Sequence, residues 1–240
     1  MITKSTYSTF CLNLFFTILM ICSKSIVSQD IHFSQYNGSL LNANPAFSGF
    51  FDGDHRIGAI YRSQWSSVPV SYSTFSAFGD TKLKTKNMKS DRIGVGLLFN
   101  NDKAGYANYS INQFYLSGSY IHKLNKDSTL LWSTGANIGF SNVAFNYSKM
   151  TFDNQYDGNS YNASQATGEN FASNATNYAD VNLGTLIKYA FKQRAYIQYG
   201  LSFSHVNAPK ITFQNNTSIK IDSKLYNYVS FQYPVAPSLD

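Results

Sequence analysis

The side chains that could do chemistry in this 240-residue chain are few, and their spacing matches no catalytic or metal-binding pattern. No histidine has another histidine three or four residues away, and none lies in an HExxH sequence, the arrangement that places two zinc ligands on one face of a helix. We therefore expect the histidines at a surface or an interface rather than in a metal site. They are His32, His55, His122 and His205.

A serine nucleophile and a pair of catalytic carboxylates are equally hard to identify. No serine lies in a G-x-S-x-G elbow. Asp52 and Asp54 are close in sequence, but they lie in FFDGDH, where aspartate and glycine favour a turn. Gly94 and Gly96 belong to a strand-like segment, in which glycine permits close packing or bending. We predict no enzyme, no cofactor and no metal; an outer-membrane lipid hydrolase with serine and histidine facing lipid is a minor alternative.

The composition indicates a β-protein whose outer faces do not meet water in the usual way. Charged residues make up 13% of the chain, and aromatic residues make up 16%. Soluble domains carry about 25% charged residues. The basic residues are spread along the chain, with the densest run at residues 82–89, and this argues against nucleic-acid binding, which needs clustered lysine and arginine.

Residues 1–28 have the pattern of a secretory signal peptide. Lys4 supplies the positive start, residues 10–22 supply the apolar core, and Ser28 is a small residue at the expected cleavage point. The core is shorter than the roughly 20 apolar residues that a membrane helix needs. Both cysteines lie in this segment, so the mature chain would have no disulfide. An N-terminal anchor and a lipidated cysteine are the alternatives.

The elements that must position the remaining polar side chains are strands, because apolar residues alternate with small or polar ones along most of the chain. Successive side chains of a strand point to opposite faces, so each such segment has one apolar face. Residues 92–100 give the clearest case. The other expected strands are residues 56–65, 71–82, 107–123, 130–140, 142–148, 180–191, 195–205, 211–214 and 225–233.

Alternation by itself fits both a soluble sandwich, with the apolar face inside, and a membrane barrel, with the apolar face toward lipid. The length of the segments favours the membrane barrel, because about ten residues cross a bilayer at a tilt. The connections favour it too: residues 125–128 and 192–194 predict tight turns, whereas residues 101–107 and 149–179 predict longer loops. Short periplasmic turns and longer outer loops are typical of such barrels.

We therefore predict an all-β fold, a transmembrane antiparallel β-barrel of the outer-membrane type. Residues 29–55 would form a plug or turn segment and residues 56–240 a partial barrel with a long loop at 149–179. This loop would either meet a partner outside the cell or have no fixed contacts. Charged side chains near the lipid midplane cost about 2–4 kcal/mol, so the polar residues of the strands should face the lumen, to pair there or to line a channel. They are Arg56, Arg62, Gln64, Asp180 and Lys188.

Several blocks of the sequence resemble the PorP/SprF family. The opening QDIHFSQY is followed by NPAFSG and then by YRSQW, and further matches are GVGLLFNNDKAG, YIHKL and NLG, the last beginning a strand in relatives. The resemblance implies an outer-membrane β-barrel of Bacteroidetes that belongs to the type IX secretion system and often to gliding motility. Relatives continue beyond the region that matches residues 226–239, so the resemblance predicts a C-terminally truncated chain with only part of the strands, unable to close a barrel alone.

The resemblance further implies a non-enzymatic protein in the cell outer membrane that assists export or surface anchoring of cargo such as adhesins. Its partners would be type IX secretion and gliding components, the secreted cargo adhesin and outer-membrane lipid, with no nucleic acid. A porin-like or substrate-specific outer-membrane channel is the alternative, and a secreted β-sandwich binder is a third hypothesis.

The segment of residues 44–49 is the strongest candidate for a family-specific element. Its Asn-Pro pair favours a turn, and its phenylalanine could anchor it inside the barrel. Two interpretations stay open: the segment plugs the periplasmic mouth, or it contacts a partner. The candidate packing or partner residues are Asn44, Pro45, Phe47 and Gly49.

Overall fold

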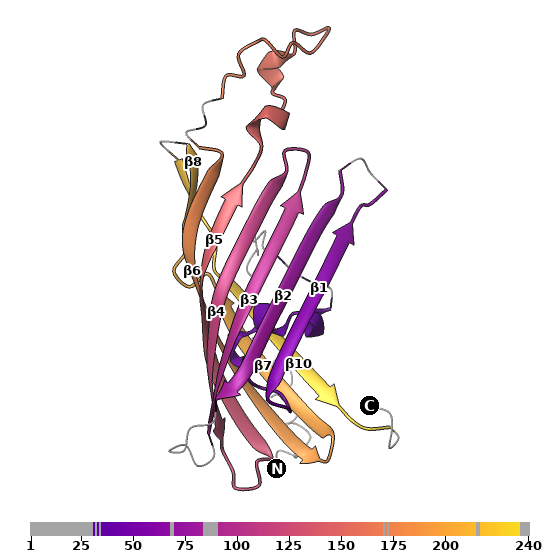
Figure 1. Cartoon of the computed structure of the whole chain (residues 1–240), viewed down its shortest axis with the longest axis vertical. Helices are drawn as coiled ribbons and strands as arrows, with labels where there is room; N and C mark the ends of the chain where they lie inside the picture. Colours follow the sequence, from indigo (N-terminus) through magenta and orange to yellow (C-terminus); the bar gives the residue numbers. More distant parts are fainter. Residues whose placement is uncertain are drawn as a thin grey trace, which may run out of the picture.

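The computed structural model describes residues 31, 33, 35–67, 70–83, 91–169, 171, 173–214 and 217–235. The expected signal peptide, residues 1–28, lies outside the described residues, as does most of the basic run at residues 82–89. The described chain is an eight-stranded antiparallel sheet that curls around a short helical segment (Figure 1). The prediction of an all-β fold is confirmed.

Each strand of the large sheet pairs with its neighbour in sequence, in the order β1-β2-β3-β4-β5-β6-β7-β10. These strands are nine to eighteen residues long, close to or above the about 9–11 residues that a membrane strand needs. They are β1 (His55–Gln64), β2 (Tyr72–Leu83), β3 (Arg92–Ala104), β4 (Tyr109–Lys123), β5 (Leu130–Ala144), β6 (Ala175–Lys192), β7 (Ala195–Ser204) and β10 (Lys224–Gln232).

Two further strands, β8 (Lys210–Gln214) and β9 (Thr217–Lys220), form a separate hairpin between β7 and β10. Within the part of the chain that the structure describes, β1 pairs only with β2, and β10 pairs only with β7. The described sheet is therefore a half-barrel with two edges (Figure 1). Among the same residues, no helix is long and apolar enough to cross a membrane.

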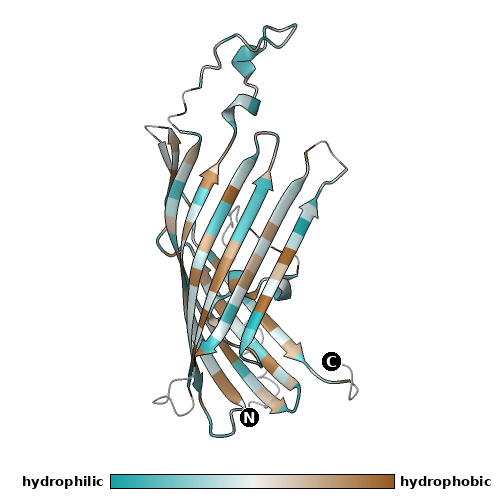
Figure 2. Cartoon of the chain, viewed as in Figure 1, coloured by the Kyte–Doolittle hydropathy of each residue, from teal (hydrophilic) through white to brown (hydrophobic). Residues whose placement is uncertain are grey.

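The two faces of the sheet have opposite character. Apolar side chains such as Leu97, Phe114 and Ile138 are exposed on the outer face. Apolar residues alternate with polar ones along the strands (Figure 2). The inner face instead buries polar side chains such as Asn100 and Asn137. This arrangement inverts that of a water-soluble protein and is the one that a lipid-facing barrel wall requires.

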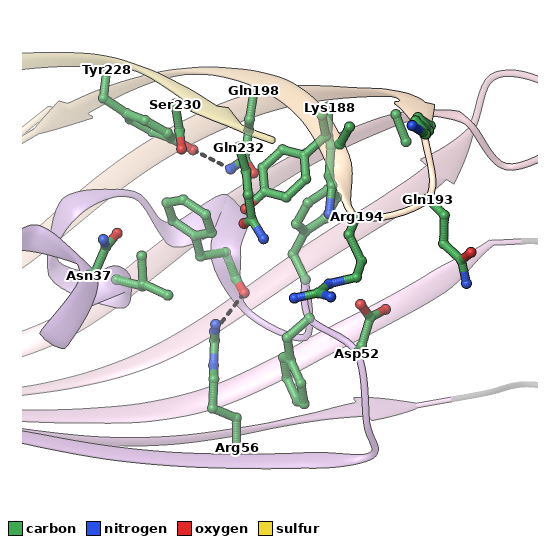
Figure 3. A pocket seen from close by; sticks show the side chains of 18 residues that line it. Asn37, Asp52, Arg56, Lys188, Gln193, Arg194, Gln198, Tyr228, Ser230 and Gln232 are labelled. Atoms are coloured by element: carbon green, nitrogen blue, oxygen red, sulfur yellow. Dashed lines mark hydrogen bonds between the residues drawn. The ribbon is translucent and has the colours of Figure 1, made fainter. Parts of the chain in front are cut away.

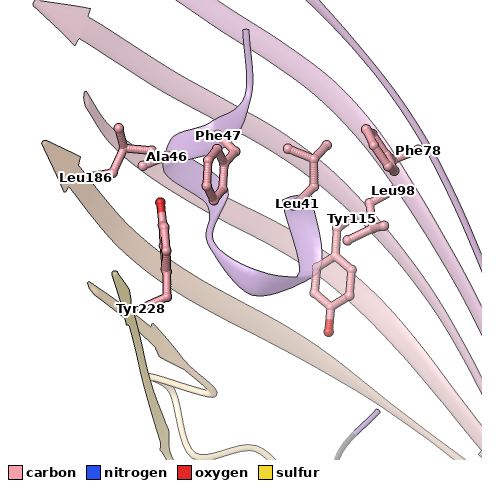
Figure 4. Close-up of a cluster of buried hydrophobic side chains, with 8 residues drawn as sticks. All are labelled: Leu41, Ala46, Phe47, Phe78, Leu98, Tyr115, Leu186 and Tyr228. Atoms are coloured by element: carbon pink, nitrogen blue, oxygen red, sulfur yellow. The ribbon is translucent and has the colours of Figure 1, made fainter. Parts of the chain in front are cut away.

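The core lies inside the curl and is built around one segment, residues 36–50, which we call the inner segment. It contains η1 (Tyr36–Gly38), α2 (Leu40–Ala43) and η2 (Pro45–Phe47), and η2 packs against β4, β5 and β6. Its apolar side chains meet inward-facing residues of the sheet in one buried cluster (Figure 4). The cluster consists of Leu41, Ala46, Phe47, Phe78, Leu98, Tyr115, Leu186 and Tyr228.

The prediction of a long loop at residues 101–107 is wrong. β3 continues to Ala104, and only residues 105–108 form the turn. Asparagine and aspartate read as turn formers in the sequence, but across the strands they find polar partners: Asn101 donates to the amide oxygen of Asn112 at 2.6 Å, and Thr74 donates to Asp102 at 2.5 Å. Such cross-strand pairs stabilise a strand.

The long loop is also displaced from the predicted residues 149–179 to residues 145–174, because β5 continues to Ala144 and β6 begins at Ala175. Asn142 donates to Asn177 at 2.7 Å across these extended ends. The expected strand at residues 142–148 is therefore the end of β5, followed by a 3-10 turn, and the NLG block lies in the middle of β6 rather than at its start.

A lysine introduced on the outer face should destabilise the protein according to its depth in the bilayer. We expect Leu116→Lys, in the middle of β4, to lower the free energy of unfolding by about 2–4 kcal/mol, and Ser73→Lys, near the end of β2 on the same face, to lower it by about 0–1 kcal/mol. Urea unfolding in lipid vesicles, followed by tryptophan fluorescence, measures both values. Equal effects of the two lysines would contradict the assignment of this face to lipid.

Candidate functional site

The inner segment lies so close to the wall of the sheet that three strands carry glycine at the points of contact. A Cβ atom at Gly94 of β3, Gly135 of β5 or Gly184 of β6 would lie within 3.0 Å of an atom of residues 44–48. With a larger side chain at any of these three positions, the inner segment could not lie this close to the sheet unless the backbone moved. The sequence predicts close packing or bending at Gly94, and the structure shows close packing against the backbone of Ser48.

The carbonyl oxygens of the inner segment accept hydrogen bonds from side chains of the sheet. Buried carbonyl groups need such donors, because they are shielded from the water that would otherwise donate to them. Polar residues on the inner faces of β1, β4, β5 and β7 supply the donors. The pairs are Asn137 to Leu41 at 3.1 Å, Ser202 to Ala43 at 2.6 Å, Ser133 to Ala46 at 2.7 Å, Arg56 to Phe47 at 3.0 Å and Ser119 to Ser48 at 2.5 Å.

Asn44 is fully buried and uses both ends of its amide. Its nitrogen donates to the carbonyl oxygens of Thr185 at 3.0 Å and Leu201 at 3.1 Å, and its oxygen accepts from the backbone N–H of Ala46 at 2.9 Å. The extended backbone of Asn44 suits a residue that precedes proline. Pro45 then begins η2, a position where its missing N–H is no loss.

Phe47 and Gly49 complete the turn that the Asn-Pro pair begins. The ring of Phe47 stacks on that of Tyr228, with 5.4 Å between the ring centroids. Gly49 has a φ of 65°, which favours glycine, and its N–H donates to Asp80 at 2.7 Å. A side chain at Gly49 would also meet the backbone of Gly94. The four candidate residues at positions 44, 45, 47 and 49 therefore form one packed unit.

Arg56 and Asp80 form a two-point ion pair on the inner face, where β1 meets β2. The guanidinium donates from Nε at 3.0 Å and from Nη2 at 2.8 Å, and the carboxylate of Asp80 is fully buried. Paired N–H donors on one carboxylate give both strength and a fixed orientation. Sequence reasoning did not select Asp80, although its position in the alternation of residues 71–82 places it on the inner face.

The other inward-facing candidates are distributed along the sheet. Arg62 and Gln64 lie on the inner side of β1, toward the end opposite to Arg56. Asp180 is buried in β6, where it accepts a hydrogen bond from the hydroxyl of Tyr115 at 2.6 Å and lies 2.9 Å from Nδ1 of His205. The structure thus does not bring the five charged or polar candidates into one site.

The expectation that the histidines lie at a surface or an interface is wrong for His205, which is buried against Asp180. Its partner lies 25 residues away in sequence, so no local pattern indicates the pair. His55 is exposed, His122 is partly exposed and pairs with Asp91 at 2.8 Å, and His32 lies outside the described residues. Among the described residues, no group of three potential metal ligands exists.

A cavity of about 690 Å³ lies beside the inner segment, at the end of the sheet where residues 193–194 join β6 to β7 (Figure 3). Lys188 contributes to its wall, and its ammonium group lies 3.9 Å from the ring centroid of Tyr196. Gln198 and Tyr228 add a hydrogen-bonded pair at 2.8 Å. This combination of cations, amides and aromatic rings can bind a ligand.

An antiparallel half-barrel with an apolar outer face, a polar inner face and a segment docked inside defines a protein of the outer-membrane barrel class. The family described as "Type IX secretion system membrane protein PorP/SprF" matches residues 26–238, nearly the whole chain. The chain belongs to this family, as its opening motifs predicted. No curated protein and no solved structure matches the chain.

A side chain at Gly184 should disrupt the docking of the inner segment. We expect Gly184→Val to lower the free energy of unfolding by about 1–3 kcal/mol or more, because the new atoms overlap Asn44 and Pro45. Gly118→Val is the matched control, since Gly118 also lies in a strand but has open space where its Cβ would be. Urea unfolding and limited proteolysis measure both variants, and equal losses would contradict the close-packing role of Gly184.

Removing the carboxylate of Asp80 should lower the free energy of unfolding more than removing an exposed charge does. We expect Asp80→Asn to lower the free energy of unfolding by about 3–5 kcal/mol, because Arg56 is left without its buried partner. Asp157→Asn, in the exposed loop, is the control. Denaturant unfolding of both variants in the same detergent tests this expectation, and a stable Asp80→Asn protein would show that the ion pair is not required.

Proposed function

We propose that this protein is a non-enzymatic outer-membrane component of the type IX secretion apparatus that assists the export or surface anchoring of cargo such as adhesins. The family match carries the assignment to the secretion system. The described residues contain no group of three potential metal ligands, which is consistent with a role in binding. In this proposal residues 1–28 direct export from the cytoplasm and are then removed.

The inner segment serves as a plug in this proposal. Asn44, Ala46, Phe47 and Ser48 are buried, and each uses a polar group in a hydrogen bond with the sheet. They are thus not displayed to a partner, which favours sealing over direct docking. The same filled interior argues against the alternative of a porin-like channel, for which conductance in planar bilayers is the direct measurement.

The proposed orientation of the sheet in the membrane follows from the lengths of the connections between its strands. Residues 193–194 and 124–129 form the short turns at one end of the sheet, and the long loop of residues 145–174 lies at the other (Figure 1). Short turns face the periplasm in outer-membrane barrels, so the long loop would face the cell exterior.

The long loop has a defined shape that suits recognition of a partner. Tyr147, Phe152 and Phe171 pack together, with ring centroids 5.3–6.4 Å apart. Two further tyrosines, Tyr156 and Tyr161, are exposed and form a small β-bridge. Exposed tyrosines on a shaped loop favour protein contact at low entropic cost. We assign the contact with cargo to this loop.

Replacing the two exposed tyrosines tests the cargo role. We expect Tyr156→Ser combined with Tyr161→Ser to reduce the amount of cargo adhesin recovered with the detergent-solubilised protein about tenfold or more, because exposed aromatic residues often dominate an interface. Tyr106→Ser is the control, since Tyr106 is also exposed and lies in a turn at the same end of the sheet. Wild-type protein that recovers neither a type IX component nor an adhesin would overturn the proposed function.

A further inference from the structure

Three neighbouring strands, β3, β4 and β5, carry the same succession of side chains on their outer faces. Strand register places corresponding residues side by side, as it does for Leu97, Leu116 and Ile138, so the succession forms rows across the three strands. These three aliphatic side chains are all exposed. Toward the long-loop end they are followed by an aromatic row, a row of amides and a lysine, and we call this part of the outer face the graded strip.

The aliphatic and aromatic rows border a hollow in the lipid-facing wall. The hollow has a volume of about 770 Å³, and its lining includes the small residues Ala77 and Gly79 of β2. The aromatic row consists of Phe99, Phe114 and Phe140, and the ring centroids of the first two lie 4.7 Å apart. Because the outer face of a membrane barrel meets acyl chains, an acyl chain is the occupant that this apolar hollow fits.

The amide row is a feature that a plain lipid-facing wall does not require. Asn101 donates to Asn112 at 2.6 Å, and Asn142 donates to Asn177 of β6 at 2.7 Å, while register places Asn112 beside Asn142. The row therefore continues across four strands. Each amide has two N–H donors and an oxygen with two lone pairs, so one hydrogen bond within each pair uses only part of this capacity. The row can bind a head group that carries both donors and acceptors.

Lys103 follows the amide row at the long-loop end of β3. It is exposed, and register places it between Ser73 of β2 and Ser110 of β4. This end of β3 is hydrophilic in Figure 2. A lysine ammonium group binds phosphate as a point charge, and the neighbouring hydroxyls can add hydrogen bonds. From the aliphatic row to the lysine, β3 rises about 20 Å, so at a tilt the succession covers about half of a bilayer.

We propose that the graded strip binds one molecule of a phosphorylated glycolipid. An acyl chain would lie in the hollow, the hydroxyl and amide groups of the sugars would meet the asparagines, and a phosphate would meet Lys103. A glycerophospholipid has the chain and the phosphate, but it lacks the sugar that makes use of the amide row. The inference rests on the proposed function only in placing the long-loop end outside the cell, since the outer leaflet is the one that carries glycolipid.

Native mass spectrometry of the purified, detergent-solubilised protein tests the inference. The probe is diphosphorylated lipid A, and phosphatidylethanolamine and phosphatidylglycerol at the same concentration are the comparisons. We expect one molecule of lipid A to be retained, with about tenfold more complex than either phospholipid gives, because the phospholipids leave the amides without sugar partners. Equal retention of the three lipids, or a preference for a phospholipid, would overturn the inference.

Variants of the amide row locate the binding. We expect Asn112→Leu combined with Asn142→Leu to lower the retention of lipid A about tenfold, because it removes the centre of the row. Asn227→Leu is the matched control and should leave retention unchanged, since Asn227 is exposed on the outer face of β10, three strands from β5.

A lysine variant keeps the test independent of folding defects in the double variant. We expect Lys103→Gln to lower the retention of lipid A about tenfold as well, because a hydrogen bond to a charged group is lost, whereas Lys126→Gln, in the turn at the other end of the sheet, should have no effect. Retention that neither the asparagine nor the Lys103 variant lowers would show that lipid A binds elsewhere and would overturn the inference.

The failure of this inference can be told apart from the failure of the proposed function. Cleavage of the long loop by protease added to whole cells measures the orientation separately. If lipid A is not preferred while type IX components and cargo still co-purify with the wild-type protein, the graded strip is not a glycolipid site and the proposed function stands.

Discussion

The close approach of one backbone segment to the inner wall of the sheet is the constraint on which the rest of this structure depends. Glycines in β3, β5 and β6 leave room for residues 44–48, and serine and asparagine side chains of neighbouring strands donate to the carbonyl groups of the inner segment. A sheet that turns its apolar face to lipid cannot also use that face to form its own core. Its cohesion inside the curl must therefore come from a segment that is small enough to lie against the wall and polar enough to be held there.

The ion pair of Arg56 and Asp80 connects this inner segment to the start of the sheet. Asp80 accepts from the guanidinium of Arg56 and from the backbone N–H of Gly49, and Arg56 also donates to the carbonyl of Phe47. One buried carboxylate thus ties the end of the inner segment, the first strand and the second strand together. A buried charge pair of this kind is costly to break on one side only, which makes it a fixed point for the register of β1 against β2.

The two ends of the sheet differ in character. At one end the long loop presents exposed tyrosines, and at the other a cavity lies beside the inner segment. Among the described residues, neither end contains a group of three potential metal ligands. The chain belongs to a family of type IX secretion system membrane proteins.

The alternation of apolar and polar residues predicts which side chains share a face of each strand, because it has a period of two and does not depend on distant contacts. The sequence also placed Arg56 and Asp180 on the inner side and marked residues 44–49 as a turn, since the Asn-Pro pair restricts the backbone locally. The ends of the strands depend on contacts across the sheet: the sequence predicts a loop at Asn101 and the start of a separate strand at Asn142, whereas their partners in neighbouring strands extend β3 and β5 through them. The partnerships of Asp80 and His205 were likewise set by strand register, which joins residues about 25 positions apart and leaves no trace in a local pattern.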